Sequence, residues 1–147
     1  MRHVRLHSTL VQALVTSACC GALTLALAAA PQDQHEAGAH HHPEAAKVKN
    51  PVPADATSVA AGKDIYAKNC ASCHGDTGKG DGAMGDELTP KPSNLVDEEW
   101  KHGSTDGEIF TLIRDGSKGT GMKAYRRKLS AHQIWDTVNY IRSIGPH

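Results

Sequence analysis

Aromatic residues are scarce in this sequence of 147 residues, because Phe, Trp and Tyr together make up only 4% of the chain. The first third of the chain also lacks the hydrophobic pattern of a protein core, which leaves only about ninety residues for a small folded domain. A domain of that size buries little apolar surface and is seldom stable without additional support. The composition therefore predicts that something besides the chain's own side chains fills the core.

An excess of charge of one sign is also lacking, since 16 Lys and Arg residues balance 16 Asp and Glu residues. This balance argues against a nucleic-acid-binding protein, which would be basic. The glycine- and aspartate-rich stretch at residues 75–85 lacks the G-K-[ST] ending of a phosphate loop and the acidic order of an EF-hand. No Ser-His-Asp or paired-carboxylate arrangement is detectable, so the sequence contains no recognisable hydrolytic site.

The informative stretch is Cys70-Ala71-Ser72-Cys73-His74, a C-x-x-C-H motif. This spacing is typical of the attachment site of a c-type haem. The two thiols add to the two vinyl groups on one edge of the macrocycle, and the adjacent imidazole is held beneath the iron as a ligand. The motif therefore predicts one covalently bound haem c per chain, attached through Cys70 and Cys73 and ligated by His74.

Three other interpretations of the two cysteines are weaker. A thioredoxin-type redox pair would need a βαβ pattern around it, and none is present. A zinc site would need two more ligands at finger-like spacing, for which His102 and His132 are available but no second C-x-x-C exists. A structural disulfide between Cys70 and Cys73 would not need a histidine next in line.

The residues around the motif resemble the class I cytochrome c family. The resemblance is carried by residues 62–75 (GKDIYAKNCASCHG) and 78–82 (GKGDG), and by 119–122 (GTGM) and 129–144, which are similar to the family's methionine loop and C-terminal helix. It covers residues 57–146. It implies a small all-α domain wrapped around one haem, with histidine and methionine as axial ligands, that carries single electrons.

The second axial ligand is predicted to be Met122. The chain has three methionines, and Met1 lies in the N-terminal export segment that is described below. Met84 follows His74 closely, on a short path around the haem edge. Met122 lies in a glycine-flanked loop that can bring a thioether close to the iron. The family commonly has proline after this methionine, where this chain has Lys123.

The hydrophobic spacing predicts three to five helices and no strands. The first begins near Thr57 or Ser58, either of which can cap it, and leads into Cys70. Gly62 allows a close helix crossing, and in the family resembled the last helix crosses there. Two capping boxes open further helices, at Thr105–Glu108 and at Ser130–Gln133. A short helical turn with Trp100 buried is expected at residues 97–102. Residues 75–85 and 90–95 are expected to wrap the haem edge, where Asn94 would supply a hydrogen bond.

The N-terminal part has the composition of an export segment and a linker. Residues 1–30 combine a basic start, an apolar run and small residues, which indicates a signal peptide or an N-terminal membrane anchor. Residues 31–56 are rich in His, Pro and Ala, which indicates a disordered linker before the cytochrome c domain at 57–147. The linker histidines could bind a metal or simply be solvated: His35, His40, His41 and His42. We therefore expect a periplasmic protein that is either free or tethered to the inner membrane through residues 1–30.

The predicted function is that of an electron carrier rather than an enzyme. With His74 and Met122 both on the iron, no position remains for a substrate. The alternatives are a peroxidase-like haem enzyme or a gas or redox sensor, which would need a methionine ligand that can be displaced. The expected partners are a membrane or periplasmic oxidase, reductase or dehydrogenase. An acidic docking surface is expected on the partner because a basic run brackets Met122: Lys118, Lys123, Arg126, Arg127 and Lys128.

Acid–acetone extraction tests the covalent attachment. Because two thioether bonds survive this treatment, haem should remain on the protein after extraction. Replacing both Cys70 and Cys73 by alanine should release the haem and unfold most of the domain, since the core is small. Haem that is extracted from the unaltered protein would contradict the attachment.

Overall fold

The computed structural model describes residues 43–98, 100 and 103–145, and every regular element within these ranges except one short 3-10 helix is an α-helix. The elements are η1 (Ala45–Lys47), α1 (Ala56–Asn69), α2 (Ala71–His74), α3 (Asp106–Asp115) and α4 (Ala131–Ile144). No strand occurs among the described residues, so the predicted all-α fold is confirmed. The predicted signal peptide or anchor, the four linker histidines and His102 lie outside the described residues.

Helix α1 begins at Ala56, one or two residues earlier than predicted, and has a different cap. The side chain of Asp55 caps it by accepting a hydrogen bond of 2.9 Å from the backbone N–H of Ser58. Ser58 itself is buried, and its hydroxyl donates to Asp136 Oδ1 at 2.6 Å. The prediction of Thr57 or Ser58 as the cap was wrong because the Ser58 hydroxyl is used in a contact with α4.

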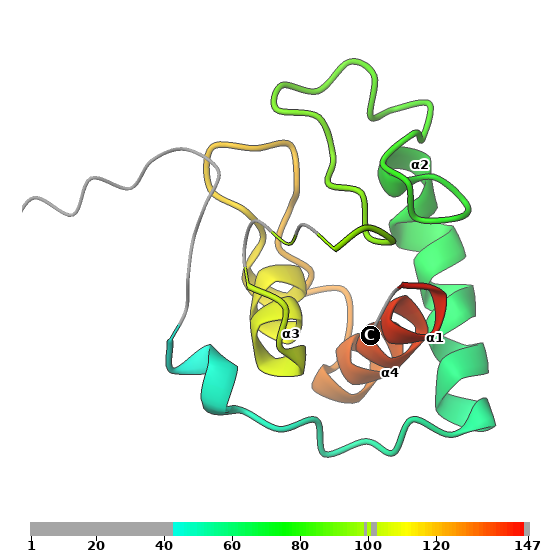
Figure 1. Cartoon of the computed structure of the whole chain (residues 1–147), viewed down its shortest axis with the longest axis vertical. Helices are drawn as coiled ribbons and strands as arrows, with labels where there is room; N and C mark the ends of the chain where they lie inside the picture. Colours follow the sequence, from blue (N-terminus) through cyan, green and yellow to red (C-terminus); the bar gives the residue numbers. More distant parts are fainter. Residues whose placement is uncertain (1–42, 99, 101–102, 146–147) are drawn as a thin grey trace, which may run out of the picture. The chain divides into compact units, whose positions relative to one another are not determined.

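Helices α1 and α4 cross at Gly62, where the absence of a side chain allows a close approach, as predicted. Figure 1 shows the two helices side by side. A Cβ atom added to Gly62 would overlap the carbonyl oxygen of Asp136 and lie 2.8 Å from the Cβ of Tyr140. One turn further along α1, the rings of Tyr66 and Tyr140 pack with their centroids 5.2 Å apart. This close crossing places the C-terminal end of α1, and with it the C-x-x-C-H motif, against the core.

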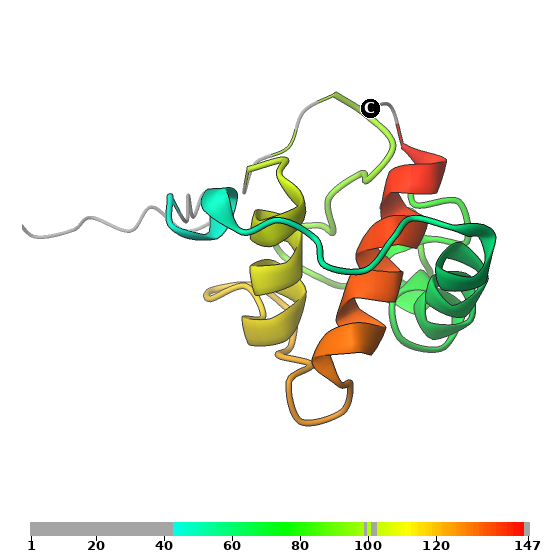
Figure 2. The same cartoon turned by 90° about the horizontal axis from the view of Figure 1, so that it is seen from below.

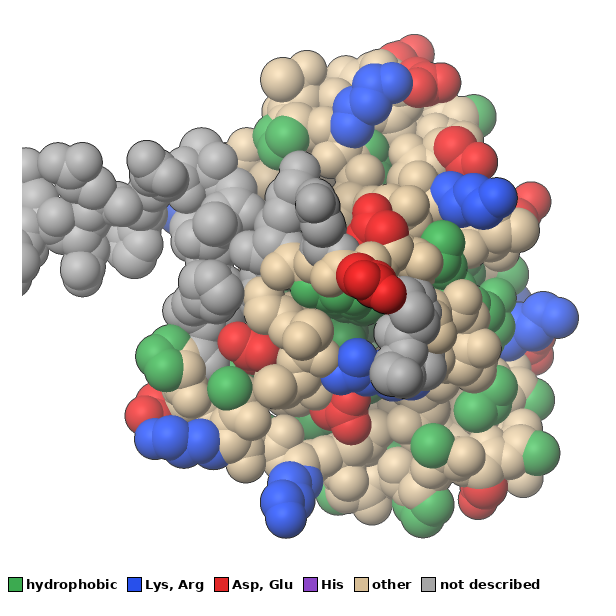
Figure 3. Space-filling model, in the orientation of Figure 1, with side chains coloured by type: hydrophobic (Ala, Val, Ile, Leu, Met, Phe, Trp, Pro, Cys, Tyr) green, Lys and Arg blue, Asp and Glu red, His purple; other side chains and the backbone are tan. Residues whose placement is uncertain are grey.

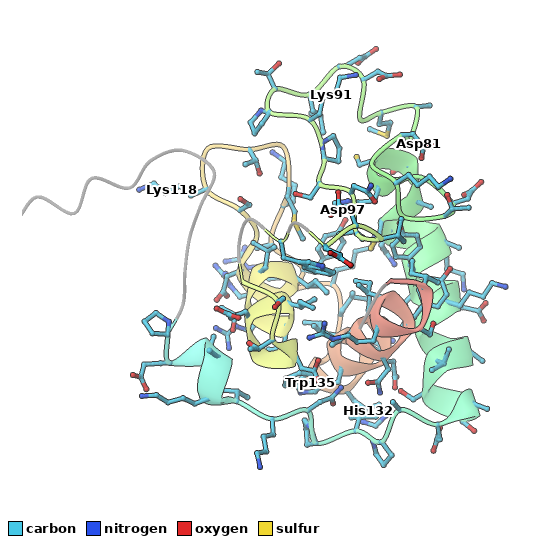
Figure 4. The ribbon with its side chains drawn as sticks, in the orientation of Figure 1. Asp81, Lys91, Asp97, Lys118, His132 and Trp135 are labelled. Carbon is cyan, nitrogen blue, oxygen red and sulfur yellow. The ribbon has the colours of Figure 1, made fainter. Side chains whose placement is uncertain are left out.

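Both predicted capping boxes are present, at Thr105 with Glu108 and at Ser130 with Gln133. The two helices that they open, α3 and α4, pack through Phe110 and Trp135, whose rings are stacked with centroids 4.0 Å apart. Trp135 lies between the two helices in Figure 4. These contacts complete a three-helix core that contains most of the aromatic side chains of the domain.

Residues 43–55 pack on the helical domain, although the sequence places them in the predicted linker. The carbonyl oxygen of Val48 lies so close to Gly107 of α3 that an added Cβ atom would approach it to 2.7 Å. The side chain of Asn50 donates to Asn139 Oδ1 of α4 at 2.7 Å, and Asn139 donates to the carbonyl of Val52 at 3.2 Å. Figure 2 shows this segment crossing α3 and α4 before it enters α1.

A short helical turn was expected at residues 97–102, but the described residues of this stretch do not form one. Asp97 and Glu98 lie in a bend, and Trp100 is half-buried rather than buried. The Asn94 side chain, which accepts a hydrogen bond from the N–H of Val96 at 3.0 Å, holds the chain in a turn just before this stretch. None of the described helices is long and apolar enough to span a membrane.

The helix crossing can be tested by Gly62→Leu, with Ala60→Leu as the control on the exposed face of α1. The leucine at position 62 would meet the backbone of α4, so we expect a loss of about 3 kcal/mol or more in the free energy of unfolding. The control should change this free energy by less than about 0.5 kcal/mol. Denaturant unfolding of the haem-loaded protein measures both, and equal effects would contradict the close crossing.

Candidate functional site

The C-x-x-C-H motif forms a single helical turn that continues from α1. Cys70 joins the two helices, and its carbonyl oxygen accepts hydrogen bonds from the N–H groups of Cys73 at 3.1 Å and His74 at 2.9 Å. Residues three apart on a helix share one face, so the two sulfur atoms lie on the same side of the turn. The sequence spacing of the motif thereby places two neighbouring thiols at the end of a rigid helix. Figure 1 shows α2 continuing from the end of α1.

No disulfide joins Cys70 to Cys73, and both side chains are half-buried. Burial raises the pKa of Cys70 to about 12, and the neighbouring Cys73 adds to this rise. Before haem attachment, a thiol with such a pKa is protonated at neutral pH. This environment does not match a thioredoxin-type pair, in which the reactive cysteine has a lowered pKa.

His74 is oriented by a backbone carbonyl. Its Nδ1 lies 3.0 Å from the carbonyl oxygen of Ser93. A carbonyl oxygen only accepts, so Nδ1 must carry the proton and Nε2 is left unprotonated, as a metal ligand must be. Burial lowers the pKa of His74, which also favours the neutral imidazole. The Asn94 side chain accepts a hydrogen bond from the N–H of Val96, and the predicted hydrogen bond of Asn94 near the haem stays a prediction.

The glycine-rich stretch after the motif lies directly on α2. The N–H of Gly82 donates to the carbonyl of Cys73 at 3.1 Å, and the N–H of Met84 donates to that of Ser72 at 2.9 Å. A Cβ atom added to Gly85 would lie 2.6 Å from the Cys73 carbonyl oxygen, so glycine is needed for this approach. Asp81, labelled in Figure 4, lies on this stretch beside α2. The stretch thus holds the motif in place by backbone contacts.

The two candidate methionines differ in their surroundings. The side chain of Met84 is 62% exposed. Met122 is half-buried and packs against the hydrophobic core. Its N–H donates to the Thr120 hydroxyl at 3.1 Å, and that hydroxyl donates to the carbonyl of Ser117 at 2.9 Å. Thr120 was not singled out in the sequence, although a threonine two residues before the bonded N–H is a recognisable turn signal.

The donor groups of this region fit a haem. They comprise two thiols on one helical turn, an imidazole with an unprotonated Nε2 and a half-buried thioether. By contrast, no group of three or more His, Cys, Asp or Glu side chains in the described part of the chain is placed to hold a metal ion.

Comparison with known proteins identifies the family. Residues 57–141 match the family model described as cytochrome C oxidase, cbb3-type, subunit III. The chain belongs to this family. It therefore contains a cytochrome c domain that binds a c-type haem covalently and takes part in electron transfer, and the predicted cofactor is confirmed. Cys70 and Cys73 have the spacing that this attachment requires.

The similarity to curated relatives is confined to this domain. The chain is 35% identical over 86 residues to the cbb3-type cytochrome c oxidase subunit FixP of Bradyrhizobium diazoefficiens, which is 58% of this chain and 27% of FixP. The match thus spans about a quarter of the relative's length. Among solved structures, the chain is similar to the reducing HAO-like protein complex Kustc0457/Kustc0458 of Kuenenia stuttgartiensis, with a TM-score of 0.61, 27% identity and coverage of 67% of this chain and 50% of that one. Cytochrome cL from Hyphomicrobium denitrificans has a TM-score of 0.54 at 27% identity, over 67% of this chain and 53% of that one.

Proposed function

We propose that this cytochrome c domain carries single electrons with His74 and Met122 as the two axial ligands of its iron. The observation that carries the proposal is the hydrogen bond of His74, because Nδ1 bonded to the Ser93 carbonyl leaves Nε2 free to ligate the iron of a bound haem. The bound haem supplies the one-electron couple. The chain supplies the ligands, the fixed orientation of the imidazole and an apolar surrounding.

Met122 is the better candidate for the second ligand for two reasons. A half-buried thioether against the core is shielded from water, whereas the largely exposed Met84 is not. In addition, the turn around Met122 is held at both ends by the Thr120 side chain. A methionine ligand raises the reduction potential relative to a second histidine. A protein ligand on each side leaves no position for a substrate, which supports a carrier rather than an enzyme.

The names of the relatives suggest the physiological setting. FixP and CcoP are both described as subunits of cbb3-type cytochrome c oxidases. We propose that this domain exchanges electrons with a membrane-bound oxidase or a comparable respiratory partner outside the cytoplasm. The segment at residues 1–30 would direct export or act as the tether, and residues 31–42 would link it to the domain.

The proposed docking surface is the basic segment around Met122. Lys118, Lys123, Arg127 and Lys128 are exposed, and Lys118 extends away from the helices in Figure 4. The positive charge of Lys128 lowers the pKa of Cys70, although burial raises this pKa by more. Lys128 is therefore near the haem attachment site. A positive rim close to both Met122 and Cys70 would attract an acidic partner to the haem edge.

Arg126 contributes less to this surface than its place in the sequence suggests. Its guanidinium lies 3.1 Å from a carboxylate oxygen of Asp115, which also pairs with Arg114 at 2.6 Å. Because Asp115 is shared with Arg114, it compensates the positive charge of Arg126 only in part. On the face in Figure 3, acidic and basic side chains are interspersed, so the charge separation belongs to particular segments rather than to a whole side of the domain.

Replacing the two methionines tests the axial ligand. Met122→Ala should abolish the weak long-wavelength absorption band of methionine-ligated ferric haem and lower the reduction potential, because the thioether favours the ferrous state. Met84→Ala should leave both unchanged, since this side chain is exposed. The reverse result would move the assignment to Met84. Ready binding of carbon monoxide to the unaltered ferrous protein at neutral pH would favour an enzyme or sensor instead.

Charge reversal tests the docking surface. Lys123→Glu combined with Arg127→Glu should slow electron exchange with an acidic redox partner at low ionic strength by about 10- to 1000-fold and flatten its dependence on salt. The reduction potential should change little, because both side chains are exposed. The control is Lys49→Glu with Lys63→Glu, which makes the same change of charge at exposed positions outside the segment. Equal rates for the two double variants would place the docking surface elsewhere.

A further inference from the structure

The side chain of Tyr125 connects the two segments that carry the proposed iron ligands. Its hydroxyl donates a hydrogen bond of 2.7 Å to the carbonyl oxygen of Asn69, the residue directly before Cys70. Tyr125 itself lies three residues after Met122. Of the hydrogen bonds between described residues, this is the one that joins residues 117–129 to residues 69–75.

The backbone on either side of the tyrosine is fixed, so its side chain acts from a rigid base. The N–H of Tyr125 donates to the carbonyl of Ile113 in α3 at 3.1 Å. Its own carbonyl accepts from the N–H groups of Lys128 at 2.8 Å and Leu129 at 2.9 Å, which forms a turn before α4. The ring packs against the hydrophobic core. The hydroxyl is therefore held toward α1 by contacts that do not depend on the haem.

We propose that Tyr125 is a positioning residue that holds the Met122 loop against the end of α1 and thereby keeps the methionine in place as a ligand. The proposal depends on Met122 being that ligand, as proposed above. Residues 70–74 carry the haem attachment and His74, whereas Met122 belongs to a loop between α3 and α4. A methionine remains bound only if the two segments keep a fixed separation, and the Tyr125–Asn69 hydrogen bond fixes it.

A contact between this loop and the stretch after α2 is less directional. Leu88 packs on Gly121, where an added Cβ atom would lie 2.7 Å from the leucine Cδ2. Such an apolar contact resists compression but allows sliding, because dispersion is not directional. The tyrosine bond adds the directional restraint. Burial raises the pKa of Tyr125, so its hydroxyl remains a donor throughout the neutral range.

Tyr125→Phe removes the hydroxyl and keeps the ring, so it tests the restraint without opening the core. Loss of one hydrogen bond should raise the population with Met122 detached by about 2- to 10-fold. The affinity of the ferric haem-loaded full chain for added imidazole, which competes with the methionine, should rise by the same factor. The pH at which the methionine absorption band disappears should fall.

The matched control is Tyr66→Phe. The Tyr66 hydroxyl donates to the carbonyl of Gly75 at 2.8 Å, a bond of the same kind that lies on the histidine side of the motif. This variant should lose stability toward denaturant without a change in imidazole affinity. An unchanged imidazole affinity in Tyr125→Phe would overturn the positioning role and leave Tyr125 a structural residue.

The ligand assignment is checked separately. If Met122→Ala keeps the methionine band, the assignment of Met122 fails, and the role of Tyr125 fails with it. If Met122→Ala loses the band while Tyr125→Phe binds imidazole as the unaltered protein does, only the role of Tyr125 is overturned.

Discussion

The close crossing of α1 and α4 at Gly62 is the contact on which the rest of this domain depends. A polar network beside the crossing fixes its register: Ser58 donates to Asp136, and Asn139 donates to Ser58 Oγ at 2.9 Å. Such buried networks stabilise one arrangement and penalise others, because any shift leaves polar groups unpaired. Asn50 extends the network to residues 43–55, so the segment before α1 is held by the same residues. The small core thus gains a unique arrangement from few side chains.

The position of the haem motif follows from this crossing. α1 passes through Cys70 into α2 without a loop, so whatever fixes α1 also fixes both thiols and His74. The loop with Met122 belongs to the other half of the domain, between α3 and α4. Binding a metal from two segments requires a set distance between them, since a displacement of even about 1 Å impairs a functional site. The interactions between the halves therefore determine ligation as much as the ligands do.

The sequence predicted the parts of this domain that depend on local chemistry. The two capping boxes and the C-x-x-C-H turn are each encoded within a few residues, and all are present. The close crossing at Gly62, which the family resemblance implied, is present as well. Prediction from the sequence failed where a side chain has a distant partner. Ser58 was mistaken for a cap because its bond to Asp136 spans 78 residues, and the contact between Tyr125 and Asn69 spans 56. The Ser93 carbonyl was missed because a backbone acceptor has no signature in the sequence. The assignment of Met122 stays a prediction.

Lys123 stands where the resembled family commonly has proline, and the structure explains how the loop keeps its shape without one. A proline stabilises a compatible loop by about 0.4–1 kcal/mol, mainly by restricting the unfolded chain. Here the Thr120 hydroxyl bonds both the Met122 N–H and the Ser117 carbonyl, and Tyr125 adds a third bond. At about 0.5–1.5 kcal/mol for each hydrogen bond, these restraints together exceed the contribution of a proline. The loop therefore does not need proline for rigidity, which leaves position 123 available for a positive charge beside the proposed ligand.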